Sequence, residues 1–155
     1  MNSITFPIIV LNLVFSILAF NQGEIMARYQ FSPYMIAHRR QWYRFLTHAF
    51  LHADWLHLII NMLVLYSFGK AVEYRFYAYF GSPGVFVYAG MYLGAIFASS
   101  FTTYRKNRNN PWYNAVGASG AVSAVLFSYV AFDPFGTILL YAILPLPALV
   151  WALLY

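Results

Sequence analysis

The chain contains no cysteine and very little charge. Only 8% of its 155 residues are charged, with 9 Lys or Arg against 4 Asp or Glu, while 62% are hydrophobic. The absence of cysteine excludes disulfides, zinc thiolate sites and a thiol nucleophile. So few charges cannot cover such an apolar chain in water, which indicates an integral membrane protein.

Five apolar runs lie along the sequence, and most approach the roughly 17 to 25 residues that a membrane-spanning helix needs. They cover residues 4–20, 56–69, 85–103, 115–132 and 135–155. We therefore predict an all-α membrane protein, a polytopic bundle with five transmembrane helices in one domain over residues 1–155. The second run reaches spanning length if Asp54 caps its helix and the helix continues past Lys70. Pro145 and Pro147 should kink or break the fifth helix.

The connections between these runs carry most of the charge. The basic residues are few and dispersed, which favours loop charges of a membrane protein over nucleic-acid binding. Residues 21–53 are amphipathic and rich in aromatic side chains, so we expect a structured loop in the membrane interface. Gly81 and Gly84 bound a predicted turn between the second and third runs. The expected partners are membrane lipid and membrane proteins, and not nucleic acid.

Ser119 lies among glycines and alanines at the start of the fourth run, within Asn114-Ala-Val-Gly-Ala-Ser-Gly-Ala-Val-Ser123. Small residues let other helices approach closely, so polar groups from elsewhere can reach this serine. Taken alone, the pattern is more often a helix-packing motif than a nucleophile. A serine nucleophile also needs a general base, and its tetrahedral intermediate needs hydrogen-bond donors aimed at the oxyanion.

A second polar group precedes this serine, in His48-Ala-Phe-Leu-His52 and His57-Leu-Ile-Ile-Asn61. His57 and Asn61 are four residues apart and share one helix face, and His52 can fold back over the same face. Buried imidazole and amide groups need partners or a wet cavity, so they predict a polar pocket within reach of Ser119. Metal binding by the histidines is disfavoured, because the glutamate of the zincin pattern is absent after the first of them.

These motifs, with Gly69-Lys-Ala-Val-Glu73-Tyr-Arg75 and Gly117-Ala-Ser119-Gly120, resemble the rhomboid family of intramembrane serine proteases in order and spacing. The resemblance spans residues 44–134. It implies a six-helix core, a Ser-His dyad, and cleavage of transmembrane protein substrates without a cofactor or a metal. It assigns Ser119 as the catalytic nucleophile, and His52, Asn61 and the Ser119 amide as the oxyanion hole. The supporting positions that it implies are His57, Gly117, Gly120, Arg44, Glu73 and Arg75.

Three features depart from the family pattern. The family's catalytic histidine lies on a sixth helix, whereas the four histidines of this chain all precede Ser119. We therefore expect the sixth helix and its histidine beyond Tyr155, and no proteolysis by residues 1–155 alone. Tyr77 stands where a glycine is usual, and Ser123 stands where many members have a tyrosine that stacks on the catalytic histidine.

Other interpretations stay open at this point. A rhomboid-like protein without catalytic activity would bind transmembrane segments without cutting them. A small transporter would need more polar residues facing a pore than Ser99, Ser100 and Thr137. We expect a location in the bacterial inner membrane. The family orientation puts the N-terminus in the cytoplasm, whereas the basic residues after the first and third runs favour the reverse by the positive-inside rule.

Overall fold

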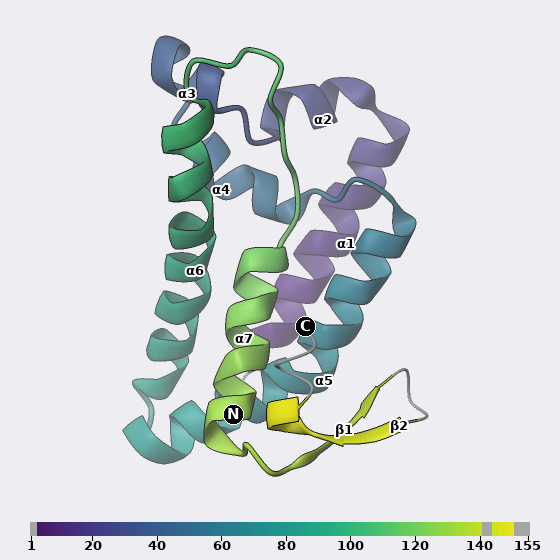
Figure 1. Cartoon of the computed structure of the whole chain (residues 1–155), viewed down its shortest axis with the longest axis vertical. Coiled ribbons are helices and arrows are strands. Elements are labelled where there is room, and N and C mark those ends of the chain that lie inside the picture. Colours follow the sequence, from purple (N-terminus) through teal and green to yellow (C-terminus); the bar gives the residue numbers. More distant parts are fainter. Residues whose placement is uncertain (1–2, 141–143, 151–155) are drawn as a thin grey trace.

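The computed structural model of the chain describes residues 3–140 and 144–150, which form a helical bundle with a small β-hairpin at one end (Figure 1). The four long helices are α1 (Thr5–Asn21), α5 (Trp55–Phe80), α6 (Gly84–Asn107) and α7 (Ser119–Phe132). They coincide with the first four apolar runs, so the prediction of a helical bundle is confirmed for this part of the chain.

Two of these helices are long and apolar enough to cross a membrane. α5 has 26 residues and α6 has 24, so they are about 39 and 36 Å long, which exceeds the roughly 30 Å of a bilayer's hydrocarbon core. α1 and α7 are apolar but shorter, with 17 and 14 residues. Large apolar side chains point outward, such as Leu56, 68% exposed, and Phe86, 76% exposed. Lipid covers such a surface better than water does, and the chain is an integral membrane protein.

Local sequence explains where α5 and α6 begin and end. The Asp54 carboxylate caps α5 by accepting a hydrogen bond from the His57 amide at 2.7 Å, which confirms the predicted cap. Gly81 ends α5 with a φ of +68°, a conformation that favours glycine. A side chain on Gly84 would overlap the Phe76 carbonyl, so the chain can turn this closely only with glycine there.

The connection between α1 and α5, here called the first loop (residues 22–54), is structured as predicted. Its elements are α2 (Gly23–Tyr29), α3 (Pro33–Arg39), α4 (Arg44–Thr47) and the 3₁₀ turn η1 (His48–Phe50). α2 and α3 lie at the end of the bundle opposite the α5–α6 turn (Figure 1). The Phe45 ring lies 5.5 Å from Phe31 and 5.2 Å from Tyr104 of α6, between centroids. Such aromatic packing fixes the loop against the bundle.

α7 packs against both α5 and α6. Leu58 and Val72 of α5 and Val125 of α7 are fully buried in a common core. Gly120 lets α7 approach α6, because a Cβ at this position would overlap the Ser99 side chain. α7 begins part-way along the bundle rather than at its end, and the segment that leads into it passes down beside the helices (Figure 1). The start of α7 therefore lies beside the lengths of its neighbouring helices and not level with their ends.

Residues 148–150 of the fifth predicted helix, which was expected over residues 135–155, are helical, whereas the prediction is wrong for residues 137–140 and 144–147. The chain there forms β1 (Thr137–Leu140) and β2 (Leu144–Pro147), an antiparallel pair with Thr137 opposite Pro147 and Leu139 opposite Pro145. Each proline lacks the amide hydrogen that a helix uses, and a strand at a sheet edge tolerates that loss. Residues 141–143 and 151–155 of the predicted helix lie outside the described residues.

Candidate functional site

Ser119 is the first residue of α7, and it is exposed. The first hydrogen bonds of this helix run from the Ala121 and Val122 amides to the Ala118 carbonyl, each at 2.9 Å. The Ser119 amide therefore belongs to the first turn, whose N–H groups have no acceptor inside the helix. This end of a helix also carries partial positive charge. A hydroxyl and an amide N–H thus stand together where developing negative charge is stabilised.

Backbone hydrogen bonds hold the segment before Ser119 against the first loop. Phe31 and Ala115 form an antiparallel bridge with N···O distances of 2.8 and 3.0 Å. The Gly117 amide donates to the His48 carbonyl at 3.0 Å. Gly117 has a φ of +130°, which residues with a side chain rarely adopt. The first loop and one glycine therefore set the position at which α7 begins.

His57 and Asn61 lie one turn apart on α5, as their spacing predicted. The Asn61 side chain is buried, and its NH₂ group donates to the His57 carbonyl at 2.8 Å, which leaves its second N–H for another acceptor. The His57 ring lies against Gly117. A Cβ placed on that glycine would be 2.7 Å from Cε1 of His57 and 3.1 Å from its Nε2. This imidazole thus reaches the backbone two residues before Ser119.

His52 is fully buried, and its ring meets the His57 ring edge-on with centroids 5.0 Å apart. Its Nδ1 lies 2.9 Å from the Ser16 hydroxyl, which donates its own proton to the Phe50 carbonyl at 3.0 Å. Ser16 therefore accepts from Nδ1–H, and Nε2 of the neutral ring carries no proton. Burial, and to a lesser extent His57, lower the pKa of His52 to about 4. At neutral pH this ring braces the first loop against α1 and has no N–H left to donate.

Arg44 is buried, and its guanidinium binds backbone carbonyls of the first loop. Nη1 donates to the Ala27 carbonyl at 3.0 Å and to the Gln30 carbonyl at 2.7 Å, and Nε donates to the Gln41 side chain at 2.6 Å. Charge-assisted hydrogen bonds of this kind compensate for the burial of the cation. They tie α4 to α2 and to the residue that follows α2.

Glu73 and Arg75 lie on α5, which continues past Lys70 as predicted. Both are inside the helix, and Arg75 is exposed while Glu73 is fully buried. The Glu73 carboxylate accepts hydrogen bonds from the Ile4 amide at 2.8 Å and from the hydroxyls of Ser3 at 2.7 Å and Thr5 at 2.9 Å. A carboxylate is favourable at the N-terminus of a helix, where amides lack partners. Glu73 therefore fixes α1 to α5.

Several buried polar residues were missed by the sequence analysis. On α1 they are Thr5, Asn12 and Ser16. Their spacing puts them on one helix face, so a stripe of small polar side chains in an apolar run was a usable signal. On α6, the Ser100 hydroxyl lies 3.2 Å from Nε2 of His48, whose Nδ1 donates to the Arg44 carbonyl at 2.8 Å. No spacing in the sequence marks that contact, because it joins two distant segments.

Comparison with known proteins gives two matches. The family model of the rhomboid domain matches residues 39–155. Rhomboid-like protein 11, chloroplastic, from Arabidopsis thaliana is 40% identical over 68 residues, which cover 40% of this chain and 24% of that protein. The chain therefore spans about a quarter of this relative's length. All the candidate site residues lie within the matched rhomboid domain.

Proposed function

This chain belongs to the rhomboid family, and we propose on that basis that it is an intramembrane serine endopeptidase that cleaves transmembrane proteins. The observation that carries the proposal is the meeting of α5 with the start of α7. There the His57 ring lies against Gly117, and Ser119 follows at the positive end of a helix. These are the elements that acyl transfer needs, a hydroxyl nucleophile beside N–H donors.

In the proposed reaction, the Ser119 hydroxyl oxygen attacks the carbonyl carbon of the scissile peptide bond. A histidine outside residues 1–155 takes the hydroxyl proton and gives it to the leaving amine as the C–N bond breaks. Water then hydrolyses the acyl ester and restores the serine. The oxyanion accepts hydrogen bonds from the Ser119 amide and from the free N–H of Asn61. No cofactor takes part in these steps.

We assign the imidazole donor of the oxyanion hole to His57 in place of His52. The His52 ring is committed to Ser16 through Nδ1, and its pKa of about 4 leaves Nε2 without a proton at neutral pH. The His57 ring is half-buried and contacts the glycine two residues before the nucleophile. An oxyanion donor must carry a proton and point at the reacting atoms, and these observations favour His57.

The remaining site residues have positioning roles in this proposal. Gly117 and Gly120 let the nucleophile segment pass close to His57 and Ser99. Arg44 orders the first loop, to which the nucleophile segment is hydrogen-bonded, and Glu73 holds α1 against α5. Arg75 makes no such contact with the residues that the structure describes. We place the protein in a bacterial inner membrane, with membrane lipid around it and transmembrane proteins as its substrates.

A second candidate is a rhomboid-like protein that binds transmembrane segments without cleaving them. The observation that favours it is the position of the four histidines, all of which precede Ser119. His52 is a poor base because its free nitrogen is buried, and His48 is buried against Ser100. If the full-length protein has no further histidine beside Ser119, this second function is the better one.

The two candidates are separated by labelling the full-length protein with a fluorophosphonate probe and by assaying cleavage of a transmembrane substrate. We expect labelling and cleavage that Ser119→Ala abolishes and that Ser128→Ala, on the same helix, leaves intact. His57→Ala and Asn61→Ala should each lower the cleavage rate about 100- to 1,000-fold. A folded protein that binds the substrate and neither labels nor cleaves would support the non-catalytic function instead.

A further inference from the structure

A cavity of about 590 Å³ lies between α1, α2 and the α4–η1 part of the first loop. Its apolar lining consists of Phe15, Leu18, Ile25, Leu46, Phe50 and Leu51. The residues that line it do not include Ser119, His57 or Asn61. Its size lies within the range of pockets that hold small ligands. The cavity is therefore a second candidate site, separate from the proposed nucleophile.

The apolar lining of the cavity includes side chains that are exposed on the outer face of the bundle. Leu18 is 39% exposed and Phe15 is 42% exposed, both on α1, so the apolar lining continues into the outer face of that helix. α2, which contributes Glu24, Ile25 and Arg28 to the lining, lies at the end of the bundle where α1 stops (Figure 1). At this level a bilayer changes from hydrocarbon to headgroups. A lipid could therefore enter without leaving its own layer.

Two opposite charges of α2 line the same cavity. Glu24 and Arg28 are both exposed and lie four residues apart, which puts them on one helix face. Within residues 3–140 and 144–150, neither side chain has an ion-pair partner, and the Arg28 guanidinium stacks only over Tyr29, 5.7 Å from the ring centroid. The mouth of the cavity thus presents an anion and a cation side by side, above an apolar interior.

We propose that this cavity binds one zwitterionic glycerophospholipid with a primary ammonium headgroup. One acyl chain occupies the apolar interior, the phosphate binds Arg28, and the ammonium binds Glu24. In such a headgroup two carbons separate the ammonium from the phosphate oxygen, so both charges can meet neighbouring side chains of α2. An anionic lipid would face the Glu24 carboxylate unpaired, and a neutral glycolipid would pair neither charge. The headgroup charges therefore select the lipid.

The first test measures lipid binding to the purified, delipidated full-length protein. Phosphatidylethanolamine, phosphatidylglycerol and a neutral galactolipid with the same acyl chains are compared by native mass spectrometry and by the thermal unfolding midpoint. We expect one retained phosphatidylethanolamine, with a higher midpoint than either other lipid gives. Arg28→Gln should weaken this binding roughly two- to fivefold, as for an exposed charge pair. Glu24→Gln should move the preference to phosphatidylglycerol. Equal effects of the three lipids on the unaltered protein would refute the headgroup assignment.

The second test fills the cavity. Leu18→Trp should lower phosphatidylethanolamine retention at least about tenfold, while Leu11→Trp, two turns earlier on the same exposed face of α1, should leave it unchanged. Equal retention in the two variants would overturn the site. If Leu18→Trp also lowers the midpoint of the lipid-free protein, another segment of the protein occupies the cavity and the proposal is wrong. None of these readouts depends on proteolysis.

Discussion

At the scale of single residues, the candidate site depends on the backbone of Gly117. This glycine has a φ of +130°, and the His57 ring occupies the space that a side chain at this position would need. Its amide also donates to the His48 carbonyl. The position of Ser119 therefore follows from a conformation that a side chain would both strain and crowd.

Gly117→Ala should lower both stability and cleavage. The added Cβ would stand 2.7 Å from Cε1 of His57, and the strained backbone adds a cost of about 1–3 kcal/mol. We expect the thermal midpoint to fall and the cleavage rate to drop at least about tenfold. Gly94→Ala on α6 is the matched control, because nothing lies within 4 Å of its Cβ position. It should be neutral or slightly stabilising, and equal losses in both variants would remove the special role of Gly117.

The sequence predicted the neighbour of His57 but not the partner of His52. The four-residue spacing of His57 and Asn61 correctly predicted a shared helix face. The path of the chain before α5 was not predictable in the same way, because His52 is held by Ser16, 36 residues earlier on another helix. Sequence spacing fixes neighbours inside a helix, whereas a loop residue finds its partner only when the helices pack.

At the scale of elements, four apolar runs became the four long helices, and the predicted cap at Asp54 is confirmed. The fifth run formed β1 and β2, and its described residues 148–150 are helical. A run of apolar residues that contains two prolines fits a broken helix or a hairpin equally well, and here the antiparallel pairing of residues 137–140 with residues 144–147 decides the outcome. Periodicity within a run therefore predicts an element only where local hydrogen bonds dominate.

The Glu73 carboxylate binds the start of α1 to α5, and a substitution of Glu73 tests how much this contact stabilises the protein. Glu73→Gln keeps the shape but loses the charge that accepts hydrogen bonds from Ser3, Ile4 and Thr5. We expect the free energy of unfolding in detergent to fall by about 1–3 kcal/mol. Arg75→Gln, on an exposed side chain of the same helix, should change it by less than about 0.5 kcal/mol. A larger effect at Arg75 would mean that the cation, and not the carboxylate, holds this end of the bundle.

The contact of α7 with α6 can be tested by a compensating pair of substitutions. Gly120→Ala would put a Cβ 2.5 Å from the Ser99 Cβ, so we expect a loss of about 1–3 kcal/mol from overpacking. Adding Ser99→Gly removes the crowded atoms, and the next neighbour, the Ala95 carbonyl oxygen, is 3.6 Å away. The double variant should be more stable than Gly120→Ala alone, by a coupling energy measured in a double-mutant cycle. Strict additivity would show that the two helices do not meet at this pair.

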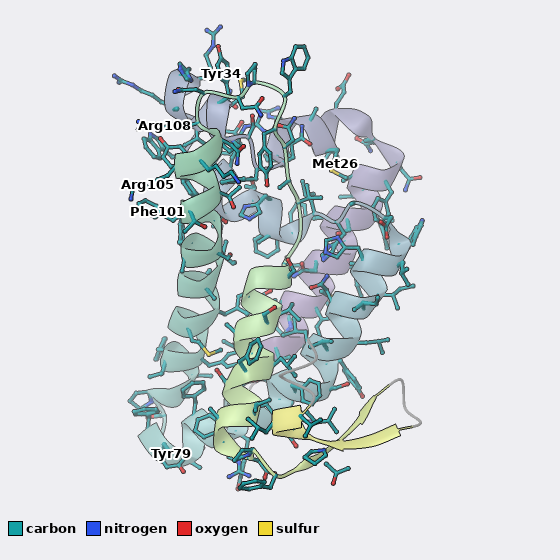
Figure 2. All side chains as sticks on the ribbon, viewed as in Figure 1. Met26, Tyr34, Tyr79, Phe101, Arg105 and Arg108 are labelled. Atoms are coloured by element: carbon teal, nitrogen blue, oxygen red, sulfur yellow. The ribbon has the colours of Figure 1, made fainter. Side chains whose placement is uncertain are left out.

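At the scale of the whole molecule, the two ends of the bundle differ in charge. The first loop and the end of α6 bring their basic residues to one end, where Figure 2 labels Arg105 and Arg108 near Tyr34 of α3, with Tyr79 at the opposite end. Arg44 should be left out when these charges are used to predict the orientation, because its guanidinium is buried and binds carbonyls of the first loop. The positive-inside rule concerns charges that the membrane and its translocation machinery can meet. Because the charge of Arg44 is bound inside the protein, the positive-inside rule is a weaker argument against a cytoplasmic N-terminus.

The orientation itself can be measured directly, because the chain has no cysteine of its own. Asn109→Cys and Ser82→Cys put one exposed thiol at each end of the bundle. If the N-terminus is cytoplasmic, as the family orientation implies, a membrane-impermeant maleimide should label Asn109→Cys in intact cells and Ser82→Cys only after permeabilisation. The reverse pattern would mean that the exposed arginines of the first loop and of α6 determine the insertion. In that case the first loop, to which the segment before Ser119 is hydrogen-bonded, would face the cytoplasm, and the substrates would have to be sought on that side of the membrane.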